Sequence, residues 1–134
     1  MKNIHDIKEE QQNKVSELIK NCSVFFAFSN EQFQKNKTPK QEGEKYVHLG
    51  MGGYLPKSQL DNYLNGLELI DKWYKAETKE TKLRKENIIY ELANHESWYT
   101  GSIDEALEAL GEDYTRAEVL AVFRSEYNKQ TVNL

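Results

Sequence analysis

Hydrophobic positions recur with helical spacing at the beginning of the chain and again over most of its second half. Near the N-terminus, apolar residues stand three or four positions apart with charged residues between them, which predicts an amphipathic helix over residues 3–20. The clearest helical pattern runs from Leu60 to Tyr74, after a start signal at Pro56 and an expected N-cap at Ser58. These two segments are the most strongly patterned in the sequence.

Three shorter helices are expected in the C-terminal half. One carries its apolar residues over residues 83–93, after a densely charged connection. Two more begin at Ser/Thr-x-x-Glu capping boxes, which start at Ser102 and Thr115. Gly111 is the expected C-terminal cap between them. The sequence therefore predicts a helical hairpin near its end.

Strand signals gather between the first two long helices. The apolar run over residues 23–28 and the segment 45–49 predict two strands. The glycines of residues 50–53 permit a tight turn into a third short strand at residues 54–55. The segment 31–44 is polar, and we expect a loop there with one helical turn around Phe33.

These elements predict an α+β fold with about five helices and a small two- or three-stranded antiparallel sheet near the N-terminus. The length of 134 residues fits a single domain over residues 1–134. Cys22 is the only cysteine, so no intramolecular disulfide forms, and its apolar neighbours predict a buried thiol. No apolar run is long enough to cross a membrane, and we expect a cytoplasmic protein.

Charge is spread unevenly along the sequence. The formal net charge is −4, but residues 91–118 hold eight acidic residues against a single basic one, Arg116. Such a stretch predicts a polarised surface that attracts a basic partner, or two solvated helix faces that are acidic by chance. Trp98 and Tyr99 precede most of these acids, and exposed aromatic residues beside charge are typical of interface hot spots. The alternative is that the two rings pack between helices.

Lysine-rich segments offer a second interpretation, which is direct binding of a nucleic acid. The basic candidates fall into two groups, one near Phe33 and the other where the charged connection runs into the apolar pattern of residues 83–93: Lys35, Lys37, Lys40, Lys82, Arg84 and Lys85. Basic groups near aromatic rings suit backbone contact with base stacking. Acidic residues interrupt both groups, which favours solvated loops instead.

A third interpretation is a metal-dependent enzyme. Glu91 and His95 stand four residues apart on one predicted helix, and His48 lies elsewhere in the chain. A zinc site needs at least three protein ligands, and the His-Glu-x-x-His pattern of zinc proteases is absent. Neither a phosphate loop nor a nucleophile elbow is present. We therefore expect no metal, no cofactor and no catalytic residue.

Several motifs resemble those of small phage and mobile-element accessory proteins that have no assigned function. They are Phe25-Phe-Ala-Phe-Ser-Asn-Glu31, the glycine turn over residues 49–56, Glu91-Leu-Ala-Asn-His-Glu-Ser-Trp-Tyr-Thr-Gly101, Ala106-Leu-Glu-Ala-Leu-Gly111 and Tyr114-Thr-Arg-Ala-Glu118. The likeness spans about residues 20–128. It implies an accessory protein that binds and disables a host factor, such as a CRISPR effector.

Charge and resemblance together predict a non-catalytic binding protein. Its partner would be a host protein or ribonucleoprotein with a basic surface. The residues expected to make the contact are the two rings and four of the acids: Trp98, Tyr99, Glu105, Glu108, Glu112 and Asp113.

Overall fold

The computed structural model describes residues 2–131, and contacts between its elements divide the chain into two compact units. The sheet unit comprises Ile7–Lys75. The helical unit comprises residues 76–131 together with residues 2–6. The expectation of a single domain stays a prediction.

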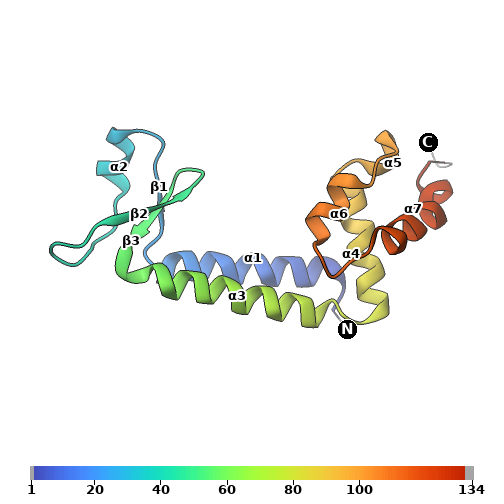
Figure 1. The fold of residues 1–134 in the computed structure, drawn as a ribbon, viewed down its shortest axis with the longest axis horizontal. Helices are drawn as coiled ribbons and strands as arrows, with labels where there is room; N and C mark the ends of the chain where they lie inside the picture. The colour runs from blue at the N-terminus through green and yellow to red at the C-terminus, as the bar shows by residue number, and fades with distance from the viewer. Residues whose placement is uncertain (1, 132–134) are drawn as a thin grey trace. The chain divides into compact units, whose positions relative to one another are not determined.

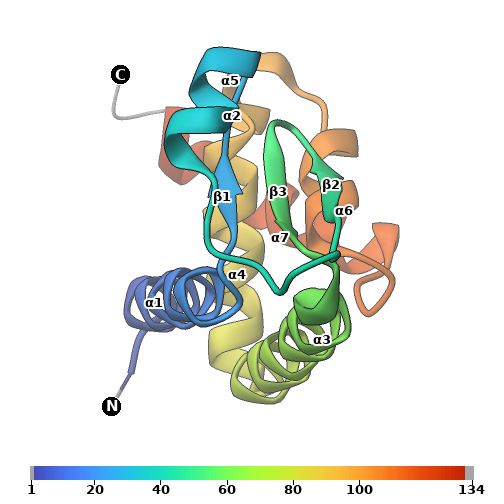
Figure 2. The same ribbon diagram turned by 90° about the vertical axis from the view of Figure 1, so that its left-hand side faces the viewer.

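Two long helices form the body of the sheet unit. Helix α1 (Ile4–Asn21) and helix α3 (Leu60–Glu77) confirm the two strongest helical patterns of the sequence. Figures 1 and 2 show them lying side by side. Gly66 allows a close approach there, because a Cβ atom at this position would clash with the side chain of Leu18.

A three-stranded antiparallel sheet lies at one end of these helices, as Figure 1 shows. The strands β1 (Phe25–Phe26), β2 (Tyr46–Gly50) and β3 (Gly53–Pro56) are arranged in the order β1-β3-β2. The glycine-rich turn between β2 and β3 is confirmed, with positive φ at Gly50, Met51 and Gly52. A short 3-10 helix, η1 (Lys57–Gln59), leads from β3 into α3, so Ser58 lies before that helix rather than capping it.

Aromatic rings cover one face of the sheet. Phe25 stacks on Tyr54, whose ring stacks in turn on His48 from the neighbouring strand. Phe33, from helix α2 (Asn30–Asn36), meets Phe25 and Tyr54 edge-on. The buried thiol of Cys22 packs separately with Val24 and Leu55, and this burial raises the pKa of the thiol.

Four helices make up most of the helical unit: α4 (Thr81–Asn94), α5 (Ser97–Thr100), α6 (Asp104–Leu110) and α7 (Arg116–Thr131). Helix α4 contacts each of the other three. The buried core consists of side chains from α4, α6, α7 and the connections between them: Ile88, Leu92, Ile103, Ala106, Tyr114 and Val119. None of the described helices is long and apolar enough to span a membrane.

The described residues form seven α-helices, so the prediction of about five was too low, whereas the mixed fold with its small sheet is confirmed. The two helices beyond that number are α2, where only one helical turn around Phe33 was expected, and α5; they have seven and four residues. Segments this short complete too few turns for hydrophobic periodicity to reveal them. Local capping stabilises α2 instead, because the Ser29 side chain accepts a hydrogen bond from the Gln32 backbone N–H.

Candidate functional site

A row of acidic side chains lies on the outer side of α6 and just beyond its C-terminal end. Glu105, Glu108 and Glu112, which we call the acidic row, are all exposed and follow one another at spacings of three and four residues. The opposite side of the helix buries Ala106 completely and packs Leu107 and Leu110 against the core. Because α6 is fixed by its apolar side, its carboxylates point outward.

The ends of α6 are defined by its neighbouring residues. The helix begins at Asp104 with Ile103 as N-cap, so the predicted capping box at Ser102 does not form; the Ser102 hydroxyl only accepts a long hydrogen bond of 3.4 Å from the Asp104 N–H. Gly111 is the C-cap, as predicted, with φ of 85°. This positive φ suits glycine, and it ends the helix immediately before Glu112.

Not every acid of residues 91–118 is available to a partner. Asp104 pairs with Arg116 at 2.5 Å, and Glu118 pairs with Arg84. Glu91 is buried and lies 3.3 Å from the Nε2 atom of a histidine in the same helix turn. In contrast, the second and third members of the acidic row have no hydrogen bond or ion pair to any residue that the structure describes. The acidic row therefore carries exposed negative charge that no arginine or lysine of the described residues neutralises.

Glu105, the first member of this row, and Asp113, which follows its last member, have partners of their own. Glu105 is 79% exposed, and its carboxylate lies 3.7 Å from the Nδ1 atom of His95. Asp113 is exposed, and its backbone carbonyl accepts a hydrogen bond from Arg84. Both residues leave carboxylate surface in contact with solvent, but Asp113 also has a structural role through its main chain.

The two predicted aromatic anchors behave differently. Tyr99 is 92% exposed on α5, which only three residues separate from α6 (Figure 1). Trp98 is half-buried and stacks on Phe123 of α7, with ring centroids 5.3 Å apart and planes inclined by 7°. The structure therefore presents Tyr99 to a partner and places Trp98 in the packing between helices.

Two of the three residues of the basic segment, Lys82, Arg84 and Lys85, are engaged within the helical unit. The Arg84 guanidinium pairs with both carboxylate oxygens of Glu118, donates to the carbonyl at position 113 and lies 4.0 Å from the centre of the Tyr114 ring. Lys85 pairs with the buried Glu126 at 3.2 Å. Lys82 is exposed. The basic segment thus serves mainly to join α4 to α7.

These pairs shift the protonation equilibria of their members. The hydrogen bond from Arg84 lowers the pKa of the Glu118 carboxyl group and raises the pKa of the guanidinium. The hydrogen bond from Lys85 lowers the pKa of Glu126 in the same way. Both carboxyl groups and the guanidinium are therefore charged near neutral pH.

The other lysine group belongs to the sheet unit. Lys35 is exposed near the end of α2, and the Lys37 Nζ atom donates to the Gln34 side chain at 2.9 Å. The Lys40 Nζ atom lies 5.8 Å from the centre of the Tyr46 ring. The basic candidates for nucleic-acid binding are thus divided between the two units.

The metal hypothesis rests on Glu91, His95 and His48. The first two approach each other at ion-pair distance, whereas His48 belongs to the sheet unit and stacks on Tyr54 with ring centroids 4.6 Å apart. Within residues 2–131, no three His, Cys, Asp or Glu side chains form a group that could hold a metal ion. The geometry thus gives this hypothesis no complete ligand set.

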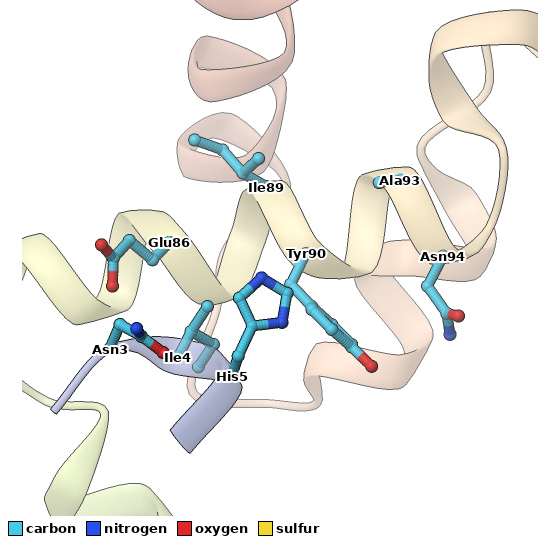
Figure 3. Close-up of a pocket in the computed structure, with 8 residues that line it drawn as sticks. All are labelled: Asn3, Ile4, His5, Glu86, Ile89, Tyr90, Ala93 and Asn94. Carbon is cyan, nitrogen blue, oxygen red and sulfur yellow. The ribbon is translucent and has the colours of Figure 1, made fainter. Parts of the chain in front are cut away.

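Sequence reasoning did not single out the residues of one sizeable cavity in the helical unit, drawn in Figure 3. Its lining includes His5, Glu86 and Tyr90. Residues 86, 89, 90 and 93 have the spacing of one helix face, and this pattern could have indicated that they share a surface. The opposite wall comes from the start of α1, and sequence separation concealed this pairing.

Comparison with known protein families finds a match over most of the chain. Residues 7–131 match a family described as a family of unknown function (DUF7659). No curated protein matches the chain. No solved structure matches it either.

Proposed function

The chain belongs to this family of unknown function, and we propose that it is a non-catalytic binding protein that docks on a basic protein surface through the acidic row and Tyr99. The observation that carries the proposal is the contrast in pairing described above. Asp104 and Glu118 are held by arginines, whereas Glu108 and Glu112 are exposed and have no partner in the described part of the chain.

Tyr99 adds an aromatic contact surface, which carboxylates alone do not provide. A tyrosine ring supplies a large contact area at low conformational cost, and aromatic side chains are enriched among the residues that dominate binding energy. Carboxylates around such an anchor act mainly by speeding association with a positive surface and by excluding partners of the wrong charge. The arrangement therefore fits a basic partner better than an acidic one such as a nucleic acid.

We further propose that the partner is a host protein or ribonucleoprotein, and that binding inhibits it. The support for this step is the resemblance of the chain to phage and mobile-element accessory proteins. A basic surface that normally holds RNA or DNA, as in a CRISPR effector, is a target that an acidic protein can occupy. In this proposal, the chain acts by covering that surface.

Charge reversal tests the docking surface. We expect replacement of all three glutamates of the acidic row by lysine to abolish capture of the partner from a host extract, because the partner's basic groups would then meet like charge. A matched triple variant reverses three exposed acids of the sheet unit and should leave capture intact: Glu9→Lys, Glu42→Lys and Asp61→Lys.

Quantitative mass spectrometry of the captured proteins, with circular dichroism to verify folding, provides the measurement. Equal capture by the two triple variants would overturn the assignment of the surface. For the inhibitory step, the captured protein's own activity is measured with the wild-type chain and with each variant. Activity that is unchanged by the bound wild-type chain would remove inhibition from the proposal.

A further inference from the structure

The cavity drawn in Figure 3 lies between the first turn of α1 and one face of α4. Its volume is about 670 Å³, which falls within the range of small-molecule sites. Its walls combine polar side chains, which include His5, Glu86 and Tyr90, with the apolar side chains of Ile89 and Ala93. The cavity shares no residue with the acidic row, so docking through that row does not account for it.

Both walls of the cavity are held in place. Asn3 and Asp6 cap the start of α1 reciprocally: the Asn3 N–H donates to the Asp6 carboxylate at 3.1 Å, and the Asp6 N–H donates to the Asn3 side-chain oxygen at 3.0 Å. On the other side, α4 is anchored by Ile88 and Leu92, which are buried in the core of the helical unit. Contacts within the helical unit thus hold both walls of the cavity.

Glu86 provides an unsatisfied acceptor at this cavity. Its side chain is half-buried, and its Oε2 atom is shielded from solvent with no hydrogen-bond partner among the described residues. Withdrawing a carboxylate oxygen from water without a donor is unfavourable. Because the Glu86 side chain lines the cavity and no described residue pairs with it, a cation bound in the cavity would compensate its charge.

The remaining lining suits an apolar body attached to that cation. The rings of His5 and Tyr90 meet edge-on, with centroids 5.6 Å apart and planes inclined by 70°. Figure 3 shows the two rings next to each other, and the lining of the cavity also includes Ile89 and Ala93 from α4. Aromatic rings and short apolar side chains favour hydrocarbon or aryl groups, and ring faces also attract organic cations.

We propose that this cavity binds a small organic cation, in which a primary ammonium or guanidinium group is carried by an apolar body. The charged group is received by Glu86, and the apolar body lies against His5, Tyr90 and Ile89. Small-molecule anions are disfavoured because the unpaired carboxylate would repel them. This function is independent of the acidic row on α6.

The test uses the full chain and 2-phenylethylammonium as the probe, followed by two-dimensional amide NMR. We expect saturable shifts centred on residues 4–6 and 86–93. The neutral isostere 2-phenylethanol should bind at least about tenfold more weakly, because a charge-assisted hydrogen bond is worth that much or more. Equal affinity for the alcohol, shifts centred elsewhere, or no saturable shift at millimolar probe would overturn the proposal.

Two variants assign the binding to this cavity. Glu86→Gln should weaken binding of the ammonium probe by about tenfold, whereas Glu80→Gln, an equal change of charge at the exposed start of the same helix, should leave it unchanged. Ala93→Leu keeps all charges and fills part of the cavity from an exposed helical position, so it should block both probes. If Glu86→Gln disturbs folding, Ala93→Leu decides, and undiminished binding by that variant contradicts the proposal.

Discussion

The basic segment on α4 and the acidic row on α6 look alike in the sequence, since each is a short helical stretch rich in one sign of charge. In the structure they differ in use. Arg84 and Lys85 of the basic segment are paired with glutamates of α7, whereas Glu108 and Glu112 of the acidic row have no partner within residues 2–131. The difference shows that a charge run stays available to a partner only where the fold brings no opposite charge to it.

Removal of the Arg84 side chain should have the largest effect. In Arg84→Met, Glu118 loses its bidentate partner, and the Asp113 carbonyl loses its donor. We expect the free energy of unfolding to fall by about 2 kcal/mol, because hydrogen bonds to charged groups contribute more than neutral ones, and partial exposure limits the loss. Urea denaturation monitored by circular dichroism measures this change.

Lys82→Met is the matched control for Arg84→Met, because it removes an exposed cation from the same helix. It should change the free energy of unfolding by no more than about 0.5 kcal/mol. Similar losses in both variants would mean that the basic segment stabilises the fold only through its net charge, and the contrast with the acidic row would then weaken.

Acid should affect the same pair less severely than substitution, because protonated Glu118 still leaves Arg84 bound to the Asp113 carbonyl and beside the Tyr114 ring. The pKa of Glu118 is lower in the folded chain than its ordinary value, owing to the hydrogen bond from Arg84. The unfolded chain therefore binds more protons, so this pair stabilises the fold above about pH 4.3. That contribution is lost as the pH falls through the lowered pKa.

Thermal unfolding measured from about pH 5 downward tests this prediction. The Glu118→Gln variant should lose stability less steeply than the wild type as the pH falls, because it has no carboxyl group to protonate at this site. Glu108→Gln should keep the wild-type dependence. If all three proteins showed the same dependence on pH, Glu118 would not be a source of acid sensitivity.

The local sequence pattern predicted most helices, but it could not predict which side chains pair across long sequence separations or where each helix begins. The two capping boxes illustrate these two limits. At Thr115 the hydroxyl accepts from the Glu118 N–H at 3.1 Å, as the pattern requires, but the Glu118 carboxylate turns to Arg84, 34 positions earlier in the sequence. At Ser102 the helix begins one residue later than predicted, and Ile103 has no side-chain cap.

The same limit applies to the candidate site. Composition pointed to the acids of α6 as a group, and the structure leaves Glu105 and Glu108 exposed while Ala106 is buried on the opposite side of the helix. The sequence contains nothing local that separates Tyr99 from Trp98. Only the position of Phe123 on α7, on which Trp98 stacks, explains why one ring is exposed and the other is not.

Neutralising the acidic row should have the smallest effect on stability. We expect Glu108→Gln with Glu112→Gln to change the free energy of unfolding by less than about 0.5 kcal/mol, because both side chains are exposed. A slight gain would follow from removing negative charge near the C-terminal end of α6, where the helix dipole disfavours it. Urea denaturation provides the measurement, with Arg84→Met as the destabilised reference. A loss as large as that of Arg84→Met would show that these acids hold the fold together as the basic segment does, and residues committed in that way could not serve as a docking surface.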